Sequence, residues 1–295
     1  MKFAWLAWWL VVTATACKFD PPGQPADRID APAGDGIMRD TPSGGDDRHL
    51  LITEIAPLDM TEFIEIYNPT PSTVDLSSYH LSDVNDYWQL AGHVAGSVGS
   101  TIVLLDSDFV VKFPPGATLA PGAVAVIAIN GPIFQAAFGV LPNFTILVPV
   151  VGSASMVEVV PNPTPQNTLL TDAAEMVVLF TWDGASDLVR DVDLVVAGKA
   201  PSAANAPAAK LTVDGPDADL IATPYGTDAD TIADMVKDAA STESYKRITL
   251  EGVFETRAGT GNGITGHDET SEQQTMTWDS GSSPETPGVI PAELR

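Results

Sequence analysis

Carboxylate side chains gather in a glycine-containing loop where their spacing could serve to bind a cation. Asp214, Asp217 and Asp219 stand two or three residues apart on this loop, and Asp228 and Asp230 follow. Ca²⁺ takes about six to eight oxygen ligands, and carboxylates at this spacing can supply several of them. Because the spacing differs from that of the helix–loop–helix calcium motif, two interpretations stay open: a calcium site, or an acidic loop solvated by water.

A second acidic loop, residues 261–272, combines further carboxylates with glycines that permit tight turns. Asp268, Glu269 and Glu272 are its oxygen donors. The same two interpretations apply to it, calcium binding or solvation. The candidate metal ligands, with calcium as the candidate cofactor, are Asp214, Asp217, Asp219, Asp268 and Glu269.

The remaining motifs do not indicate catalysis or a transition-metal site. The four histidines are His49, His80, His93 and His267. They are scattered, and no pair among them has the spacing typical of zinc ligands. No G-x-S-x-G segment presents a nucleophilic serine, and the glycine-rich run 259–263 has no lysine to hold a phosphate. We therefore predict no catalytic residue.

The charge balance excludes one class of partner and the cysteine count excludes one class of fold. The 295 residues include 14 Lys and Arg against 39 Asp and Glu, a formal net charge of -25. Such a surface repels polyanions, so we expect no nucleic-acid partner. The single cysteine, Cys17, excludes an internal disulfide framework. Hydrophobic residues make up 44% of the chain, which is enough for a folded core.

Residues 1–16 are typical of an export signal. Lys2 gives a positive start, and an unbroken apolar run from Ala4 to Val12 follows. A helix that crosses a bilayer needs about 20 apolar residues, so this run is too short to serve as a membrane span. Small residues then lead directly to Cys17.

The segment Ala14-Thr15-Ala16-Cys17 resembles the lipobox of bacterial lipoproteins. In that family the cysteine sulfur receives a diacylglycerol and the signal is cleaved in front of it. The resemblance implies lipidation of Cys17, a membrane as partner through the lipid anchor, and a location at the bacterial outer membrane or cell surface. The alternative is an ordinary cleaved signal, which implies a secreted or periplasmic protein.

Residues 17–48 are expected to form a linker after the lipidated cysteine. Pro, Gly, Asp and Ala dominate this stretch, and it has no apolar period. Such a composition buries too little apolar surface to offset the entropy of ordering. We interpret it as a disordered tether, with a calcium-ordered acidic segment as the alternative.

From Leu50 onward the pattern predicts strands separated by turns. Helix is expected only at residues 132–138 and 228–239, the second from the helical spacing of its apolar residues. Short strands with frequent turn signals indicate a β-sandwich or barrel. The strand-like runs are 50–55, 62–67, 73–76, 79–81, 101–105, 109–113, 123–129, 176–182, 188–196 and 245–254.

Several of these runs resemble a lamin-tail domain. The opening is Leu51–Ile55, then Glu62–Tyr67 with Asn68-Pro69, then Val74–Asp83. Later blocks with the same resemblance are Leu119–Ile127, Glu175–Phe180, Asp183–Val192, Tyr245–Ile248 and Thr286–Gly288. The resemblance covers about residues 50–290 and implies an immunoglobulin-like β-sandwich. Extra residues lie at about 142–168 and 198–244.

The predicted organisation is a signal over 1–16, a lipidated linker over 17–48 and a mainly β sandwich over 49–290 with long loop insertions and one short helix. The expected function is a non-enzymatic envelope lipoprotein that displays a binding, adhesion or scaffolding domain. Its expected partner is an envelope protein or a polysaccharide. The alternative is a secreted hydrolase, or an accessory module of one, with a site in the long loops.

Overall fold

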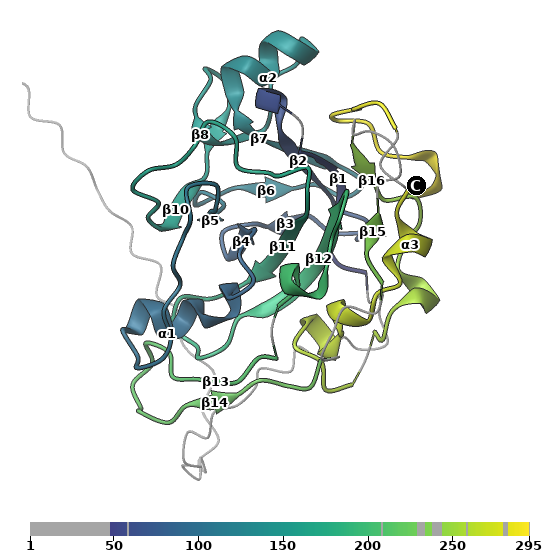
Figure 1. The fold of residues 1–295 in the computed structure, drawn as a ribbon. Coiled ribbons are helices and arrows are strands. Elements are labelled where there is room, and N and C mark those ends of the chain that lie inside the picture. The colour runs from purple at the N-terminus through teal and green to yellow at the C-terminus, as the bar shows by residue number, and fades with distance from the viewer. Residues whose placement is uncertain are drawn as a thin grey trace, which may run out of the picture. The chain divides into compact units, whose positions relative to one another are not determined.

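The computed structural model describes residues 48–57, 59–207, 209–228, 234–237, 244–257, 259–279 and 283–294. The predicted signal, Cys17 and the linker up to residue 47 lie outside these residues. Among the described residues, no helix has both the length and the apolar character that a membrane span requires. The body of the chain consists of two β-sheets with short helices and long loops around them (Figure 1).

The first sheet has six strands in the order β16-β1-β2-β7-β8-β9. Its first four strands pair antiparallel, whereas β8 and β9 add to the edge in parallel. The strands are β1 (Leu51–Ala56), β2 (Phe63–Tyr67), β7 (Val124–Asn130), β8 (Phe144–Val148), β9 (Ala154–Ser155) and β16 (Tyr245–Lys246).

The second sheet also has six strands, in the order β10-β5-β4-β11-β12-β15. All neighbours are antiparallel except β12 and β15. The strands are β4 (Tyr79–Ser82), β5 (Val110–Lys112), β10 (Val157–Val160), β11 (Glu175–Thr181), β12 (Arg190–Gly198) and β15 (Val236–Lys237). Two small pairs join β3 (Val74–Asp75) to β6 (Thr118–Leu119), and β13 (Thr212–Val213) to β14 (Thr223–Pro224).

Side-chain alternation along the strands places the main hydrophobic core between the two sheets. Ile64 of β2 and Leu179 of β11 both belong to this core. The neighbouring Val178 faces the other side of its sheet, where Tyr87 and Trp88 from the loop after β4 cover it. Successive strand residues point to opposite faces, so one strand serves two cores. The predicted two-layer sandwich is confirmed.

Short helices cap the loops. The helix expected at 132–138 is confirmed as α2 (Gly131–Phe138), which begins where the Asn130 side chain accepts the backbone N–H of Ile133 at 3.2 Å. The other α-helices are α1 (Leu90–Ala95) and α3 (Gln274–Thr277). The 3₁₀ turns are η1 (Asp59–Thr61), η2 (Tyr87–Gln89), η3 (Ala203–Asn205), η4 (Gly252–Phe254), η5 (Ile264–Gly266), η6 (Glu269–Ser271) and η7 (Ala292–Leu294).

The helix predicted over 228–239 is wrong where the structure describes that segment. Val236 and Lys237 form β15, with Val236 opposite Ala197 in a parallel pairing with β12. Val236 is buried in the main core, so tertiary packing overrides the helical spacing of the apolar residues. Residues 229–233 and 238–239 lie outside the described residues.

Two other apolar runs also differ from expectation. The run 101–105 forms no strand, because only Ile102 is buried while Val103 and Leu105 point to solvent. The run 245–254 contains only the two-residue β16 before the chain turns into η4. Conversely, the extra residues 142–168 contain three strands, β8, β9 and β10, which extend both sheets.

The C-terminal part of the chain closes one edge of the sandwich. This edge is formed by β16 and β1 of one sheet and by β12 and β15 of the other. Turns η4, η5 and η6 and helix α3 run along it, in the yellow-green segment of Figure 1. Contacts of β12 with η5 and η6 show that this segment packs directly on the second sheet.

Candidate functional site

Arg247 occupies the centre of the closed edge, immediately after β16. Its guanidinium donates two hydrogen bonds to Asp193 of β12, at 2.7 and 2.9 Å, and one to Glu272 at 2.7 Å. Its Nε donates to the carbonyl of Ile52 in β1 at 2.9 Å, and the guanidinium lies 4.9 Å from the ring centre of Trp278. One buried side chain therefore joins both sheets and the C-terminal segment.

Burial and charge act in opposite directions at this ion pair. Desolvation raises the pKa of the Asp193 carboxyl to about 7, although the guanidinium of Arg247 works to lower it. Desolvation also opposes the charge of Arg247, but Asp193 and Glu272 outweigh it and raise its pKa. Well-aligned hydrogen bonds stabilise the pair, because they must offset the free-energy cost of removing both charged groups from water.

Two histidines and three glutamates lie beside this centre and form what we call the His–Glu cluster. His49 precedes β1, and the other members flank the turns η4, η5 and η6. All five side chains are buried. The members are His49, Glu251, Glu255, His267 and Glu269.

The donor atoms of this cluster converge. Nε2 of His49 is 3.2 Å from Oε2 of Glu251, and the rings of His49 and His267 are 4.9 Å apart between centroids. Nδ1 of His267 is 3.9 Å from Glu269 Oε1 and 4.0 Å from Glu255 Oε2. His49, His267 and Glu269 each offer one donor atom within 4.8 Å of the other two, and so do His49, Glu251 and Glu255.

Close backbone packing at a glycine brings His267 to this position. A side chain on Gly261 would place its Cβ 2.0 Å from the carbonyl oxygen of His267, so only glycine allows the loop to fold back here. The N–H of Gly263 then donates to that carbonyl oxygen at 2.8 Å. The glycine-rich run 259–263 therefore shapes this loop.

Burial disfavours charge on the cluster members. Desolvation lowers the pKa of His49 well below its usual value, with His267 adding to the effect. Desolvation raises the pKa of Glu255 to about 8, and the nearby Glu272 raises it further. The pKa values of Glu251 and Glu269 are also raised well above normal, first by desolvation.

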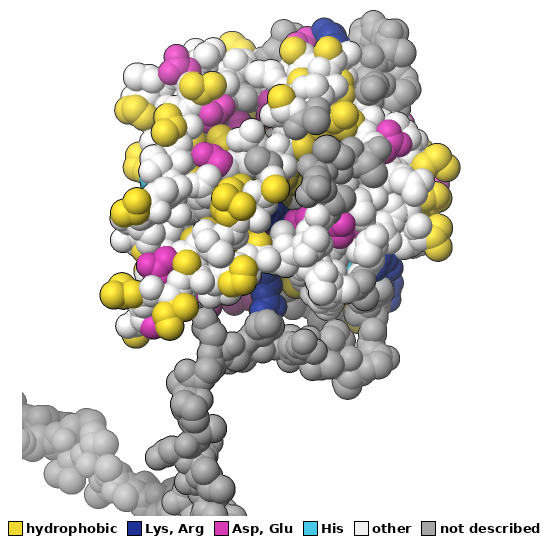
Figure 2. Space-filling model, turned by 60° about the horizontal axis from the view of Figure 1, so that its bottom comes forward, with side chains coloured by type: hydrophobic (Ala, Val, Ile, Leu, Met, Phe, Trp, Pro, Cys, Tyr) yellow, Lys and Arg dark blue, Asp and Glu magenta, His cyan; other side chains and the backbone are white. Residues whose placement is uncertain are grey.

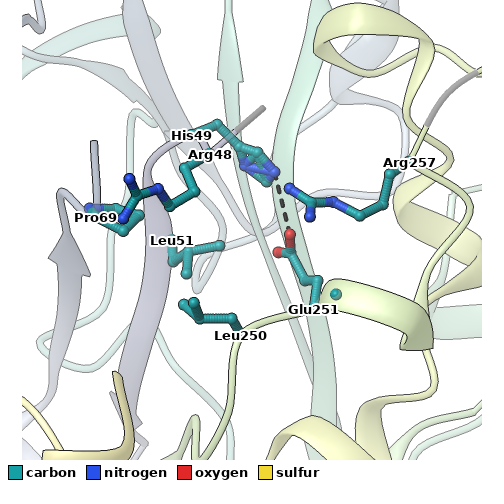
Figure 3. Close-up of a pocket in the computed structure, with 8 residues that line it drawn as sticks. Arg48, His49, Leu51, Pro69, Leu250, Glu251 and Arg257 are labelled. Atoms are coloured by element: carbon teal, nitrogen blue, oxygen red, sulfur yellow. Dashed lines mark ion pairs between the residues drawn. The ribbon is translucent and has the colours of Figure 1, made fainter. Parts of the chain in front are cut away.

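A small pocket reaches this cluster from outside. It has a volume of about 100 Å³ and is lined by His49, Glu251 and Arg257 together with exposed residues such as Arg48. Figure 3 shows the guanidinium of Arg257 pointing toward the His49–Glu251 pair, while Arg48 points away toward Pro69. The pocket is large enough for water or an ion, and smaller than the roughly 300–1,000 Å³ of sites for organic ligands.

A second buried ionic centre surrounds Lys210. Its ammonium donates to Asp191 and, at 3.2 Å, to Asp228. Tyr87 Oη donates to Asp191 at 2.7 Å, and the backbone N–H of Asn262 donates to Asp228 at 2.7 Å. Each charged group of this centre has a direct partner, and the centre ties the loop after β12 to the glycine-rich run.

The structure brings together two of the three predicted calcium ligands of the first acidic loop. Carboxylate oxygens of Asp214, Asp217 and Asp187 lie within 4.8 Å of one another. Both carboxylate oxygens of Asp187 already accept hydrogen bonds, from Gly215 and Thr223. This group does not include Asp219. Calcium binding at this loop stays a prediction.

In the second acidic loop the two predicted ligands separate. Asp268 accepts a hydrogen bond from the hydroxyl of Thr270 at 2.7 Å, and it is not a member of the His–Glu cluster. Glu269 does belong to that cluster, beside His49 and His267. Sequence spacing did not predict the pairing of these histidines. The only local signal was the density of Glu251, Glu255, Glu269 and Glu272 around His267.

Comparison with known proteins identifies one family model that matches part of the chain. Residues 43–189 match the family model of the Lamin Tail Domain. A solved structure of a DUF4876 family protein from Bacteroides thetaiotaomicron VPI-5482 is similar, with 15% identity, coverage of 83% of this chain and 74% of that chain, and a TM-score of 0.44. No curated protein matches the chain. Of the His–Glu cluster, only His49 lies within the matched residues.

Proposed function

We infer the function from the family to which this chain belongs, the lamin tail domain family, whose immunoglobulin-like domain is not catalytic. We propose that the chain is a non-enzymatic lipoprotein of the bacterial cell envelope. Its β-sandwich binds a partner there through loops at one end, and the partner is an envelope protein or a polysaccharide. A lipid on Cys17 anchors it, and residues 18–48 act as the spacer.

The binding end is formed by two long loops that are joined to each other. The loop between β4 and β5 contains Trp88 and Ser97, and the loop after β12 contains Asp214 and Tyr225. Ser97 Oγ donates to the carbonyl of Asp214 at 2.7 Å, and Tyr225 Oη donates to the carbonyl of Trp88 at 2.6 Å. The rings of Trp88 and Tyr225 meet edge to face. These contacts hold the loops in a fixed arrangement.

Large apolar side chains exposed on these loops are the observation that carries the proposal. Val98 is fully exposed, Leu220 is 91% exposed and Ile221 is 72% exposed. Exposed apolar residues on loops held by a rigid scaffold are a usual feature of recognition sites. Figure 2, which turns the bottom of the Figure 1 view toward the reader, shows hydrophobic and acidic side chains interspersed on that face.

The buried charges support binding over hydrolysis. Asp191, Asp193 and Asp228 are each paired with a lysine or arginine inside the protein, and the pocket at the His–Glu cluster is small. A hydrolase needs a cleft that holds substrate beside its acid and base. The acidic net charge also disfavours nucleic acid as the partner.

Mass spectrometry of the mature protein from a bacterial host tests the anchor. We expect an acylated N-terminus at Cys17, and a Cys17→Ser variant that is not acylated and leaves the membrane fraction. An unacylated N-terminus in the unmodified protein would overturn the lipoprotein proposal.

Capture of envelope components by the full-length protein tests the binding end. The triple variant Val98→Ser, Leu220→Ser, Ile221→Ser should lose the captured component without a change in its melting temperature. Val151→Ser is the matched control, because Val151 is 95% exposed but lies on the loop after β8. Equal capture by both variants would exclude these loops as the binding surface.

A further inference from the structure

We propose that the His–Glu cluster is a site for a divalent transition-metal ion, with Zn²⁺ as the ion that fits best. His49, His267 and Glu269 would supply the first ligands, and Glu251 and Glu255 the further carboxylate oxygens. The site goes beyond the proposed partner binding, because it lies at the closed edge of the sandwich and its role is to hold that edge together.

The hydrogen bonding of His49 leaves a lone pair aimed into the cluster. Its Nδ1 is 3.4 Å from the carbonyl oxygen of Leu50, and a carbonyl oxygen only accepts, so Nδ1 carries the proton. Nε2 then holds a lone pair, 3.2 Å from Oε2 of Glu251. Two electron-rich atoms at this distance repel each other unless a proton or a metal cation lies between them. Metal-ligating histidines usually have this second contact to a carbonyl.

The carboxylates of the cluster are buried without hydrogen-bond donors. Within the part of the chain that the structure describes, neither oxygen of Glu255 nor either oxygen of Glu269 has a hydrogen-bond partner, although both side chains are about fully buried. Buried carboxylates are normally paired, hydrogen-bonded or bound to a metal. A proton alone does not satisfy them, because a protonated carboxyl group still has a carbonyl oxygen that lacks a hydrogen-bond donor.

The number of buried carboxyl groups at this edge also favours a cation. Five buried carboxyl groups share this edge, while Arg247 and Arg257 are the guanidinium groups that act on them. Ionising several carboxyl groups away from water without enough cations carries a large free-energy penalty. A divalent ion offsets this excess at the point where the oxygens converge. The five carboxyl groups belong to Asp193, Glu251, Glu255, Glu269 and Glu272.

The donor set selects the class of metal. Ca²⁺ and Mg²⁺ prefer all-oxygen sites, whereas imidazole nitrogens together with carboxylates suit Zn²⁺, Fe²⁺ and related ions. Zinc binds histidine nitrogen and carboxylate oxygen at about 2.0–2.2 Å. The 3.2 Å between His49 and Glu251 matches neighbouring ligands of such an ion. The 3.9 Å between His267 and Glu269 requires only a small inward shift.

The position of the ligands in the chain gives the ion a structural role. His49 stands at the start of the sandwich, and the other four ligands lie in the segment 251–269 that closes its edge. An ion bound to both segments would join the beginning and the end of the folded body. Because unfolding separates these ligands, binding adds to the stability of the folded state.

Metal titration of the full-length protein tests this proposal directly. After dialysis against a chelator, calorimetry with ZnCl₂ should give one ion per chain, and Co²⁺ should give the visible absorption of a low-symmetry site. Glu269→Gln and His49→Gln should each weaken zinc affinity by at least about 10-fold. Glu293→Gln, at an exposed residue outside the cluster, should bind zinc like the unmodified protein.

A second measurement keeps the test valid if a histidine variant fails to fold. Glu269→Gln replaces a buried carboxyl group that has no hydrogen-bond partner by an amide that can donate to its neighbours, so in the absence of metal it should melt at a higher temperature than the unmodified protein. Added zinc should then raise the melting temperature of the unmodified protein more than that of the variant. Absence of zinc and cobalt binding by the unmodified protein overturns the proposal. Binding of Ca²⁺ without zinc, or zinc binding that Glu269→Gln and His49→Gln leave unchanged, also overturns it.

Discussion

The guanidinium of Arg247 holds both carboxylate oxygens of Asp193, and neither side chain is exposed to water. Arg247 follows β16 in the first sheet, and Asp193 lies on β12 in the second. Between these sheets Asp193 also accepts the backbone N–H of Ile52 at 2.6 Å. The pair thus takes the place of apolar packing at the edge where the two layers meet the C-terminal segment.

Replacing Arg247 by Met should destabilise the protein strongly. The substitution leaves Asp193 and Glu272 buried without their cation, and breaking a buried pair in this way costs about 3–5 kcal/mol. Chemical denaturation followed by tryptophan fluorescence gives the free energy of unfolding. Lys199→Met is the control, because the Lys199–Asp172 pair is about half exposed and should contribute less than about 1 kcal/mol. Similar decreases in the free energy of unfolding for both variants would show that the buried Arg247 pair contributes no more to stability than the half-exposed Lys199 pair.

Asn68 is the second position where one substitution should act strongly. Its side-chain amide donates to the carbonyls of Ser72 and Leu119, and its Oδ1 accepts the N–H of Thr70. Asn68→Ala removes these three hydrogen bonds, one of them to the buried carbonyl of Leu119, which should cost about 2–3 kcal/mol. Thermal and denaturant unfolding measure the loss. Asn85→Ala, at an exposed asparagine, should change stability by less than about 0.5 kcal/mol, and an equal effect at both sites would contradict this role for Asn68.

The turn at Asn68 is an example of the local signals that made much of the fold predictable from the sequence. The Asn-Pro turn after β2 and the Pro-Gly turn before β7 were separate local signals. In the structure the N–H of Gly122 donates to the carbonyl of Asn68 at 2.8 Å, so the two turns are bonded to each other. Turn chemistry and apolar alternation are encoded within a few residues. For that reason β1, β2, β7, β11 and β12 were placed correctly.

The closed edge was not predictable in the same way. Val236 has helical spacing to its neighbours, yet it becomes a strand because β12 offers a parallel partner across a long loop. His49 and His267 meet only after the whole C-terminal segment has folded back on the first strand. No local pattern contains this information, since the contacts depend on which edge the segment closes. The predicted ligand Glu269 lies in the cluster, but its partners could not be named from spacing.

Calcium at the first acidic loop is a separate prediction. The carboxylates of Asp187, Asp214 and Asp217 converge, so millimolar calcium should raise the melting temperature of the unmodified protein, as expected for a ligand that binds the folded state. Asp214→Asn should reduce that rise. Asp219→Asn should not, because Asp219 is outside the converging group. Differential scanning calorimetry makes the comparison, and a melting temperature that calcium leaves unchanged removes this loop as a calcium site.

Glu65 should make stability fall as the pH rises. Its carboxyl group accepts hydrogen bonds from Thr53 Oγ1 at 2.8 Å and from the N–H of Gly288 at 2.6 Å. Desolvation nevertheless raises the pKa of Glu65 to about 7, and Glu54 raises it further while Lys246 opposes the shift. The folded protein therefore holds a proton on Glu65 at a pH where the unfolded chain has released it. The stabilisation is complete below about pH 4.5 and is lost as the pH rises through about 7.

Glu65→Gln isolates this contribution from the other titrating groups. Glutamine keeps an oxygen for the Gly288 N–H and cannot ionise. The free energy of unfolding of the variant, relative to that of the unmodified protein, should therefore increase by about 2–3 kcal/mol from pH 5 to pH 8. Unfolding free energies of both proteins across this range give the difference. Glu293→Gln, at an exposed residue, should give a curve parallel to that of the unmodified protein. If the Glu65→Gln curve is also parallel, Glu65 is ionised in the folded protein throughout this range, and the contact with the C-terminal Thr286–Gly288 turn is an ionic one.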